Sequence, residues 1–227
     1  MTKKPNEFSV EQLIAEAFKF HSQGNISEAA KYYQLFLDQG FSDVRVFSNY
    51  GVILKDIGQL QKAETLQRKA IELDPNFADA HSNLGVILRD LGKLQEAEIS
   101  TRKAIELNPN FAMAHSNLGT ILKDLGNLKE AEISSRKAIE LNPDFAMAHS
   151  NLGTILRDLG NLQEAETSSR KAIELNPDHA NAHANLGIIL RELGKLEEAI
   201  LCSEKIMFIR SWSILGSYSF NYEMRLD

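Results

Sequence analysis

The chain has 227 residues, of which 43% are hydrophobic, a net charge of −6 at neutral pH and a sequence pI near 5.6. This acidic balance argues against a general nucleic-acid binder, because such proteins neutralise phosphates with clustered Lys and Arg. The one cysteine, Cys202, excludes a disulfide framework and a cysteine-rich zinc site. The charged N-terminus lacks a signal peptide's apolar run, and no stretch approaches the roughly 20 apolar residues of a membrane span. We therefore expect a cytoplasmic protein without a membrane partner.

A unit of 34 residues recurs along the chain, and the dipeptides Asn-Pro and Asp-Pro mark its end, at Pro75, Pro109, Pro143 and Pro177. Residues 112–145 and 146–179 differ at only four positions. Self-similarity at such a period is typical of solenoids, in which each unit buries its apolar face only against its neighbours. Because a solenoid presents a long concave surface, binding is the first functional hypothesis, ahead of catalysis.

The repeats divide the chain into three parts: an N-terminal tail at 1–9, an array at 10–206 and a divergent segment at 207–227. The first unit lacks the proline, and Gly40-Phe41 takes the place of the break. The last unit loses the pattern near Ile206. The units are placed at about 10–43, 44–77, 78–111, 112–145, 146–179 and, in part, 180–206.

Each unit is predicted to form an antiparallel pair of helices. In unit 78–111, four apolar residues have the i, i+3, i+4, i+7 spacing of an amphipathic helix: Leu84, Ile87, Leu88 and Leu91. Gly92 then provides a left-handed stop. A second helix follows from Gln95 and ends at Asn108-Pro109, because proline cannot continue a helix. Asn110, or its counterpart Asp144, is expected to cap the next helix.

The segment 207–227 changes abruptly in composition, with Trp212 and several other aromatic residues in a short span. Three interpretations stay open: an irregular cap on the last helix pair, the beginning or remnant of a following domain, or unrelated sequence after a truncation or frame change. An exposed last repeat could also pair with a second copy, so self-association through the C-terminal repeat is a further possibility.

The register of the repeat identifies a family resemblance. In unit 78–111, eight residues occupy positions 4, 7, 8, 11, 15, 20, 27 and 32: His81, Leu84, Gly85, Leu88, Gly92, Ala97, Ala104 and Pro109. This pattern resembles the tetratricopeptide repeat, usually written W-L-G-Y-A-F-A-P. Two departures recur: histidine replaces the tryptophan at position 4, and a small residue replaces the large one at position 24, as in Thr101, Ser135 and Ser169.

The Asn-Leu-Gly form of these repeats is most similar to those of O-linked N-acetylglucosamine transferase and of bacterial array proteins. The resemblance implies an all-α, right-handed superhelical solenoid of antiparallel helix pairs. It implies a protein-interaction scaffold that binds an extended peptide or a partner helix in its concave groove. Its first rival is the substrate-recruiting part of a glycosyltransferase- or sulfotransferase-type enzyme whose catalytic domain is absent here. Its second rival is a structural spacer or self-associating rod.

Position 6 of the first helix is asparagine in five units, at Asn49, Asn83, Asn117, Asn151 and Asn185. In the transferase arrays that this chain resembles, a matching row holds peptides by their backbone. A carboxamide suits this role because it both donates and accepts hydrogen bonds. The alternative is that the asparagines satisfy one another between units.

Residues beside this row are expected to supply selectivity. They are two methionines at position 2, serines at position 5 and a basic row at position 12: Met113 and Met147; Ser82, Ser116 and Ser150; Lys55, Arg89, Lys123, Arg157 and Arg191. The repeated histidines are expected to be packed side chains rather than a metal site, because ligands one repeat apart cannot converge on one ion. We find no nucleophile–base pairing and no phosphate loop, so we predict neither a cofactor nor an enzyme.

Overall fold

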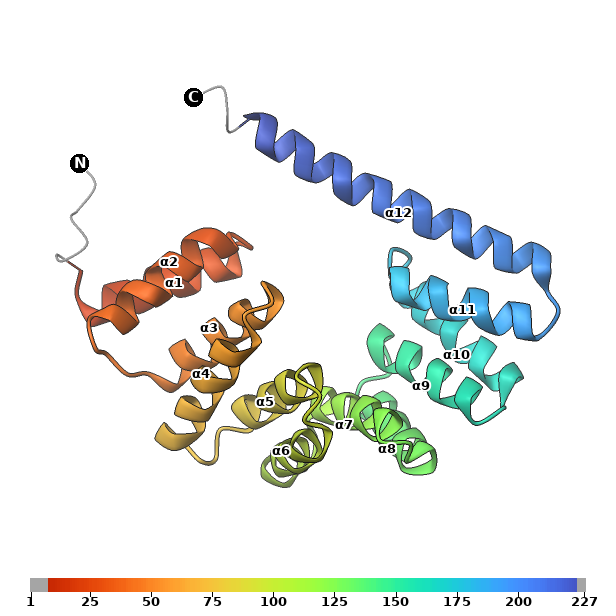
Figure 1. The fold of residues 1–227 in the computed structure, drawn as a ribbon, viewed down its shortest axis with the longest axis horizontal. Helices are drawn as coiled ribbons and strands as arrows, with labels where there is room; N and C mark the ends of the chain where they lie inside the picture. The colour runs from red at the N-terminus through yellow and green to blue at the C-terminus, as the bar shows by residue number, and fades with distance from the viewer. Residues whose placement is uncertain (1–7, 224–227) are drawn as a thin grey trace. The chain divides into compact units, whose positions relative to one another are not determined.

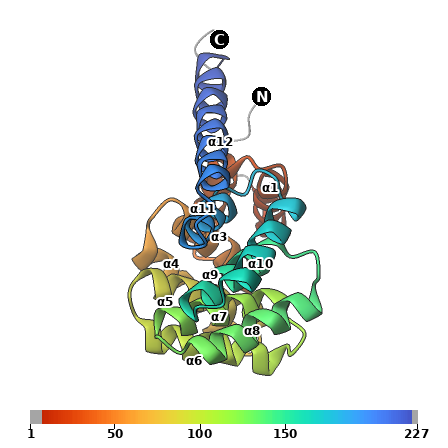
Figure 2. The same cartoon turned by 90° about the vertical axis from the view of Figure 1, so that its right-hand side faces the viewer.

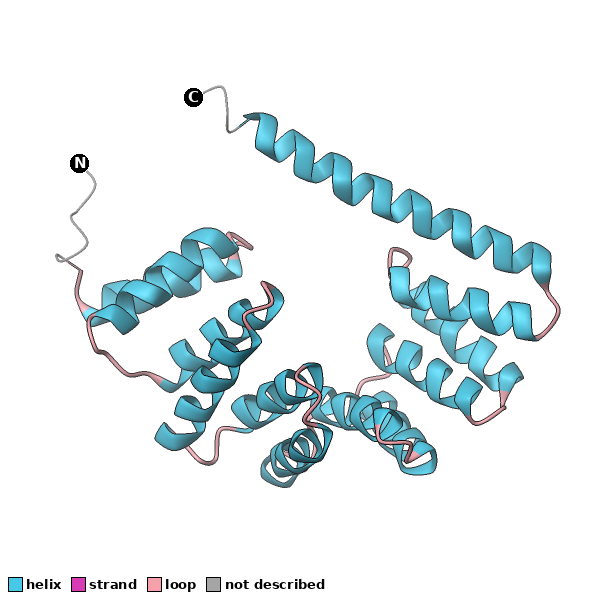
Figure 3. Ribbon diagram, in the orientation of Figure 1, coloured by secondary structure: helices cyan, strands magenta, loops and turns pink. Residues whose placement is uncertain are grey.

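The computed structural model describes residues 8–223, and it describes side chains as far as residue 209. Over residues 8–223 the chain forms twelve α-helices and no strand (Figures 1 and 3). The all-α class predicted from the repeats is therefore confirmed. The helices fall into two compact halves, residues 1–109 and residues 110–227.

The N-terminal half contains three helix pairs, in which each odd-numbered helix packs on the even-numbered helix that follows it. Helix α4 also packs on α5, so consecutive pairs are joined through the first helix of the next pair. The helices are α1 (Val10–Ser22), α2 (Ile26–Asp38), α3 (Val44–Asp56), α4 (Leu60–Leu73), α5 (Ala78–Asp90) and α6 (Leu94–Leu107).

The C-terminal half repeats this arrangement, with α8 packed on α9 and α10 packed on α11. The helices are α7 (Ala112–Asp124), α8 (Leu128–Leu141), α9 (Ala146–Asp158), α10 (Leu162–Leu175), α11 (Ala180–Glu192) and α12 (Leu196–Glu223). The segment 207–223, for which three interpretations were open, continues α12 as regular helix (Figure 2), while 224–227 lie outside the described residues. No helix in the described part of the chain is long and apolar enough to span a bilayer.

The turns follow the predicted stop signals. Gly92 has φ +76° between α5 and α6, a left-handed conformation that other residues rarely adopt. Asn108, before Pro109, is extended at φ −138° and ends α6. The predicted caps are wrong: Phe111 and Phe145, rather than Asn110 and Asp144, occupy the N-cap position, without a side-chain cap hydrogen bond. Each helix begins two residues after the polar side chain that was expected to cap it, so the N-cap lies one residue later than predicted.

Small residues let the two helices of a pair approach closely. A Cβ on Gly119 of α7 would lie 2.3 Å from Ser135 Oγ and 3.1 Å from the carbonyl oxygen of Ala131, both in α8. This approach explains why position 24 is small here, since a large side chain would meet the opposing backbone. The cost is a buried hydroxyl: Ser135 Oγ has no hydrogen-bond partner among the described residues.

Gly119→Ala is therefore expected to lower the free energy of unfolding by about 1–3 kcal/mol through overpacking. Gly187→Ala is the matched control, because its Cβ would lie 3.4 Å from Cys202 Cβ and 3.7 Å from the Ala199 carbonyl oxygen, which is ordinary contact. There alanine's helix propensity should leave stability unchanged or raise it by up to about 1 kcal/mol. Urea unfolding followed by circular dichroism measures both changes. Equal losses at the two glycines would contradict the close-approach argument.

Candidate peptide-binding site

The asparagine row lies on the first helices and is half-buried. In the N-terminal half, Nδ2 of Asn83 donates to Ser48 Oγ of the preceding unit at 3.2 Å. In the C-terminal half, Asn151 Nδ2 donates to Ser116 Oγ at 3.0 Å, and Asn185 Nδ2 donates to Ser150 Oγ at 3.2 Å. These three asparagines therefore donate to serines of the preceding unit rather than to one another, so each of the three carboxamides joins two repeats.

These contacts use only part of each carboxamide, which carries two N–H donors and an acceptor oxygen. The Oδ1 atoms of Asn83, Asn151 and Asn185 accept no hydrogen bond from a described residue, and none of them is a buried atom lacking a partner. Asn49 differs, because the preceding unit offers Tyr33 instead of a serine. Burial raises the pKa of Tyr33 to about 12, and the hydrogen bond with Asn49 opposes that shift.

The residues beside the row differ from their predicted roles. Met113 and Met147 are 39% and 37% exposed, so they are accessible to a ligand. The position-5 serines are buried and at most 3% exposed. Ser116 and Ser150 accept hydrogen bonds from the asparagines of the next unit, and burial keeps all three serines from a ligand, so their predicted role in ligand selectivity is wrong.

The basic row is largely neutralised by the acidic residue that follows each member. Four such ion pairs join neighbouring residues at 2.6–3.3 Å: Lys55–Asp56, Arg89–Asp90, Lys123–Asp124 and Arg157–Asp158. Arg191 is exposed and forms no ion pair with the described residues. The face therefore carries alternating charges instead of a basic stripe.

Three histidines at position 4 of the repeat contact a backbone carbonyl. The Nε2 atoms of His81, His149 and His183 lie 2.9–3.0 Å from the carbonyl oxygens of Pro75, Pro143 and Pro177. Because a carbonyl only accepts, Nε2 carries the proton in each case. The contact ties the break before a unit to the first helix of that unit. In the described residues no group of three or more metal-ligating side chains is assembled.

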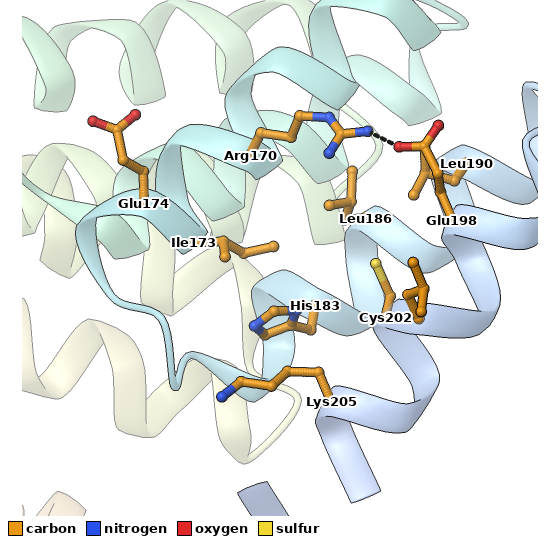
Figure 4. Close-up of a pocket in the computed structure, with 10 residues that line it drawn as sticks. Arg170, Ile173, Glu174, His183, Leu186, Leu190, Glu198, Cys202 and Lys205 are labelled. Carbon is orange, nitrogen blue, oxygen red and sulfur yellow. Dashed lines mark hydrogen bonds and ion pairs between the residues drawn. The ribbon is translucent and has the colours of Figure 1, made fainter. Parts of the chain in front are cut away.

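A second recurring feature lies between the second helices of consecutive units. A groove of about 470 Å³ between α4 and α6 has His81, Leu84 and Leu88 of α5 as its floor. The corresponding groove between α10 and α12, about 410 Å³, includes His183 and Cys202 (Figure 4). Sequence reasoning did not find these outer grooves, although apolar residues at position 22, such as Ile99, mark their rims. Ile99 is 69% exposed.

Protein-family models identify the repeat. The cilia and flagella-associated protein 70 middle TPR-like domain model matches residues 13–139, more than half of the chain, and two tetratricopeptide repeat models match residues 117–168 and 144–207. The chain belongs to the tetratricopeptide repeat (TPR) family. No curated protein matches it. Proteins with this fold generally act as non-catalytic scaffolds.

Solved structures share the TPR fold. MamA is 23% identical over 77% of this chain and 98% of its own, with a TM-score of 0.60. YrrB, described as a TPR protein with an unusual peptide-binding site, is 25% identical over 85% of this chain and 100% of its own, with a TM-score of 0.55. The APC/C hetero-tetramer Cut9–Hcn1 reaches a TM-score of 0.81 at 18% identity, over 92% of this chain and 42% of the matched chain.

Ion pairs on the second helices also join consecutive TPR units. Glu166 Oε2 lies 2.8 Å from Lys195 Nζ of the next unit, and its Oε1 lies 2.9 Å from Arg170 Nη2. The hydrogen bond from Lys195, followed by that from Arg170, lowers the pKa of Glu166 below its ordinary value of 4.5. Glu64 repeats this arrangement in the N-terminal half, where Lys93 and Arg68 lower its pKa.

The single cysteine lies in this region too. Cys202 is 8% exposed, and burial raises the pKa of its thiol. The thiolate is therefore disfavoured at neutral pH, which argues against Cys202 as a nucleophile.

A double-mutant cycle of Asn151→Ala and Ser116→Ala should reveal a coupling of about 0.5–1.5 kcal/mol, the net value of one hydrogen bond. The measurement is urea unfolding of the wild type, both single variants and the double variant. Ser135→Ala provides the control, since its hydroxyl has no described partner and its loss should not destabilise the array. A coupling near zero would mean that the asparagine does not join the two units.

Acidification should weaken the junction formed by Glu166. Because the folded-state pKa is lowered, its stabilisation is present above about pH 4.5 and is lost as the pH falls through the folded pKa. Glu166→Gln should therefore cost about 0.5–1 kcal/mol at pH 7, with the difference from the wild type vanishing at low pH. Glu132→Gln is the control, because Glu132 pairs with Arg136 but has no ion pair with the described residues of the next unit, where Asn161 occupies the repeat position of Lys195. Chemical unfolding between pH 3 and pH 7 distinguishes them; a pH-independent loss would contradict the argument.

Proposed function

We propose that the protein is a protein–protein interaction scaffold that binds an extended peptide along its first helices. The observation that carries this proposal is the partly used carboxamide row. Ser116 and Ser150 hold Nδ2 of Asn151 and Asn185, which fixes each side chain, while the Oδ1 atoms stay available as acceptors. A fixed, half-used carboxamide binds a peptide backbone with less loss of side-chain freedom than a mobile one.

The spacing of the row suits an extended ligand. Packed helices lie about 10 Å apart, and an extended peptide advances about 3.3 Å per residue. Each asparagine would therefore meet every third peptide residue. Within the C-terminal half, Asn117, Asn151 and Asn185 provide three such positions, and Met113 and Met147 provide adaptable apolar contacts beside them.

Magnitudes limit what the row alone can do. One backbone hydrogen bond contributes a net of about 0.5–1.5 kcal/mol, which is comparable to the cost of ordering one peptide residue. Selectivity must therefore come from the two methionines and from charge. Arg191 is the basic residue most available to a carboxylate, because the row's other described members have an acidic neighbour in contact.

Two of the similar structures support a protein or peptide ligand for this fold: YrrB is described by its peptide-binding site and Cut9–Hcn1 by its assembly. We accordingly propose protein or peptide partners, no nucleic acid or membrane partner, a cytoplasmic location and no catalytic activity. The net charge of −6 supports the exclusion of nucleic acid. Self-association through the C-terminal repeat is proposed as a second kind of contact, for which α12 supplies the surface.

The test begins with selection of a binder from a random linear peptide library and measurement of its Kd by fluorescence anisotropy. Asn151→Ala and Asn185→Ala should each weaken binding about 2–13-fold, the equivalent of 0.5–1.5 kcal/mol. N-methylation of the peptide backbone should be harmful at every third position. Unchanged affinity in folded variants would refute the proposal.

Two controls separate binding from stability and from the outer grooves. Ser116→Ala with Ser150→Ala removes the tethers but keeps both carboxamides, so it should weaken binding less than loss of the asparagines. Ile99→Asp changes an outer groove and leaves the row intact. If that variant alone abolished binding, the peptide site would be the outer groove instead of the asparagine row.

A further inference from the structure

The end of the array has an uncovered surface. In the pair α9–α10, the face toward the next unit is covered by α11, and Ser150, Ala165 and Ser169 are at most 3% exposed. The corresponding face of α11–α12 contains Ala184, Ala199 and Ser203, none of which is buried. A cavity of about 510 Å³ lies there, with His183, Arg191, Ala199 and Ser203 in its lining; it is bordered otherwise by Gly187, Ile188, Leu196, Ile200 and Ile206. We call these five residues with Ala184 the C-terminal socket.

The C-terminal socket differs chemically from the interior faces. Ser150 accepts a hydrogen bond from Asn185, and Glu166 accepts one from Lys195. At the repeat positions of Ser150 and Glu166 the last unit has Ala184 and Ile200, whose side chains cannot accept a hydrogen bond. Leu196 and Ile200 are 60% and 59% exposed. Apart from Arg191 at its border, the socket therefore offers apolar contacts to a helix, and it lacks the two acceptors that another copy of the repeat would need.

The N-terminal end of a second copy cannot fill this socket. Interior first helices bury Ala80, Leu84 and Ile87 against the preceding unit. The three corresponding positions of α1 are polar, namely Gln12, Glu16 and Lys19, and the last two form an ion pair at 2.9 Å. Insertion of α1 into this cavity would bury Gln12 and the Glu16–Lys19 ion pair, and removing an ion pair from water has a desolvation cost that apolar walls do not offset. Head-to-tail polymerisation is thus disfavoured.

Helix α12 carries a segment that does match. It has 28 residues, whereas α10 has 14, so it continues for residues 210–223 beyond the repeat (Figures 1 and 2). That overhang is about 21 Å long at 1.5 Å per residue, close to the length of a 13-residue first helix such as α11. Its residues 211–222, SWSILGSYSFNY, contain no charged side chain. Length and charge both suit the C-terminal socket.

The overhang cannot cover the socket of its own chain. Residues 196–206 form one wall of the C-terminal socket, and α12 runs on without interruption to Glu223. A continuous helix extends along its own axis and cannot fold back onto its own side. Residues 196–223 therefore do not supply the occupant within their own chain. We infer that two copies associate about a two-fold axis, with residues 211–222 of each lying in the C-terminal socket of the other.

This arrangement is closed: each copy provides one overhang and one socket, so two copies use both and leave none for a third. It deepens the proposed self-association and does not depend on peptide binding, since the asparagine row lies on other residues. Ile200→Asp should therefore leave the peptide contacts of Asn151 and Asn185 intact, and Asn151→Ala should leave the dimer intact; Arg191, which lines the socket cavity, is kept unchanged in both tests.

Sedimentation velocity at about 1–100 µM tests the inference on full-length protein. The wild type should sediment as a dimer, and Ile200→Asp should halve the mass by placing a charge in the socket. Leu201→Asp is the matched control, because Leu201 is equally apolar and 61% exposed but borders the outer groove. It should remain dimeric. A monomeric wild type, or an Ile200→Asp dimer, would overturn the inference.

A complementation experiment distinguishes reciprocal exchange from simple apolar contact. The overhang variant carries Ile214→Asp, Leu215→Asp and Phe220→Asp, which lie on three different sides of a helical wheel. Alone it should be monomeric, as should Ile200→Asp. Mixed, the two should form a heterodimer, because one supplies an intact overhang and the other an intact socket. Failure to form it while both chains show wild-type circular dichroism would refute the exchange.

Discussion

Each helix pair in this protein has one face that only the following unit can cover. The constraint arises because two short helices bury a single seam between them and leave a second apolar surface exposed. Between interior units this face is covered through recurring contacts: the hydrogen bond from Asn185 to Ser150, the ion pair of Lys195 with Glu166, and the packing of α11 on α10. The candidate binding row and the ends of the array are both consequences of how that face is covered.

The asparagine row shows how one side chain serves two purposes. Its N–H group holds the preceding unit, which explains why a mediocre helix former is kept at this register. Its oxygen remains available to a ligand. The structural role and the binding role therefore do not exclude each other. Stability and peptide affinity become coupled, since any substitution of the asparagine affects both.

The local features of the fold could be predicted from the sequence because they depend on neighbouring residues. Gly92 and Asn108-Pro109 mark helix ends through backbone preferences that act within a few positions. The N-caps were mispredicted for a related reason: Asn110 and Asp144 are suitable cap residues, but the helices begin two residues later, at Ala112 and Ala146. Polar residues before an apolar run indicate that a helix begins nearby, but they do not determine the residue at which it begins.

The candidate site could be predicted only in part. The periodic asparagines identified the face, but the Asn151–Ser116 contact spans 35 positions and depends on how one helix sits on another. No local pattern shows that position-5 serines are buried acceptors rather than ligand contacts. The ion pair of Arg157 with Asp158 was also missed. The spacing of charged residues indicates which of them share a helix face but does not determine their side-chain conformations. The outer grooves were missed because they lie between helices of different units.

The first and the last unit each have a face that no further repeat covers, and the residues on these two faces differ in character. At the N-terminus, charges on α1 make the exposed face compatible with water, which is the usual requirement for a terminal repeat. At the C-terminus, the interior acceptors are replaced by Ala184 and Ile200, so the surface becomes less compatible with water and with a further repeat. A terminal unit that had only drifted from the repeat would retain some of these acceptors. Loss of both, beside an overhang whose residues 211–222 carry no charge, is the pattern expected of a surface adapted to bind a helix.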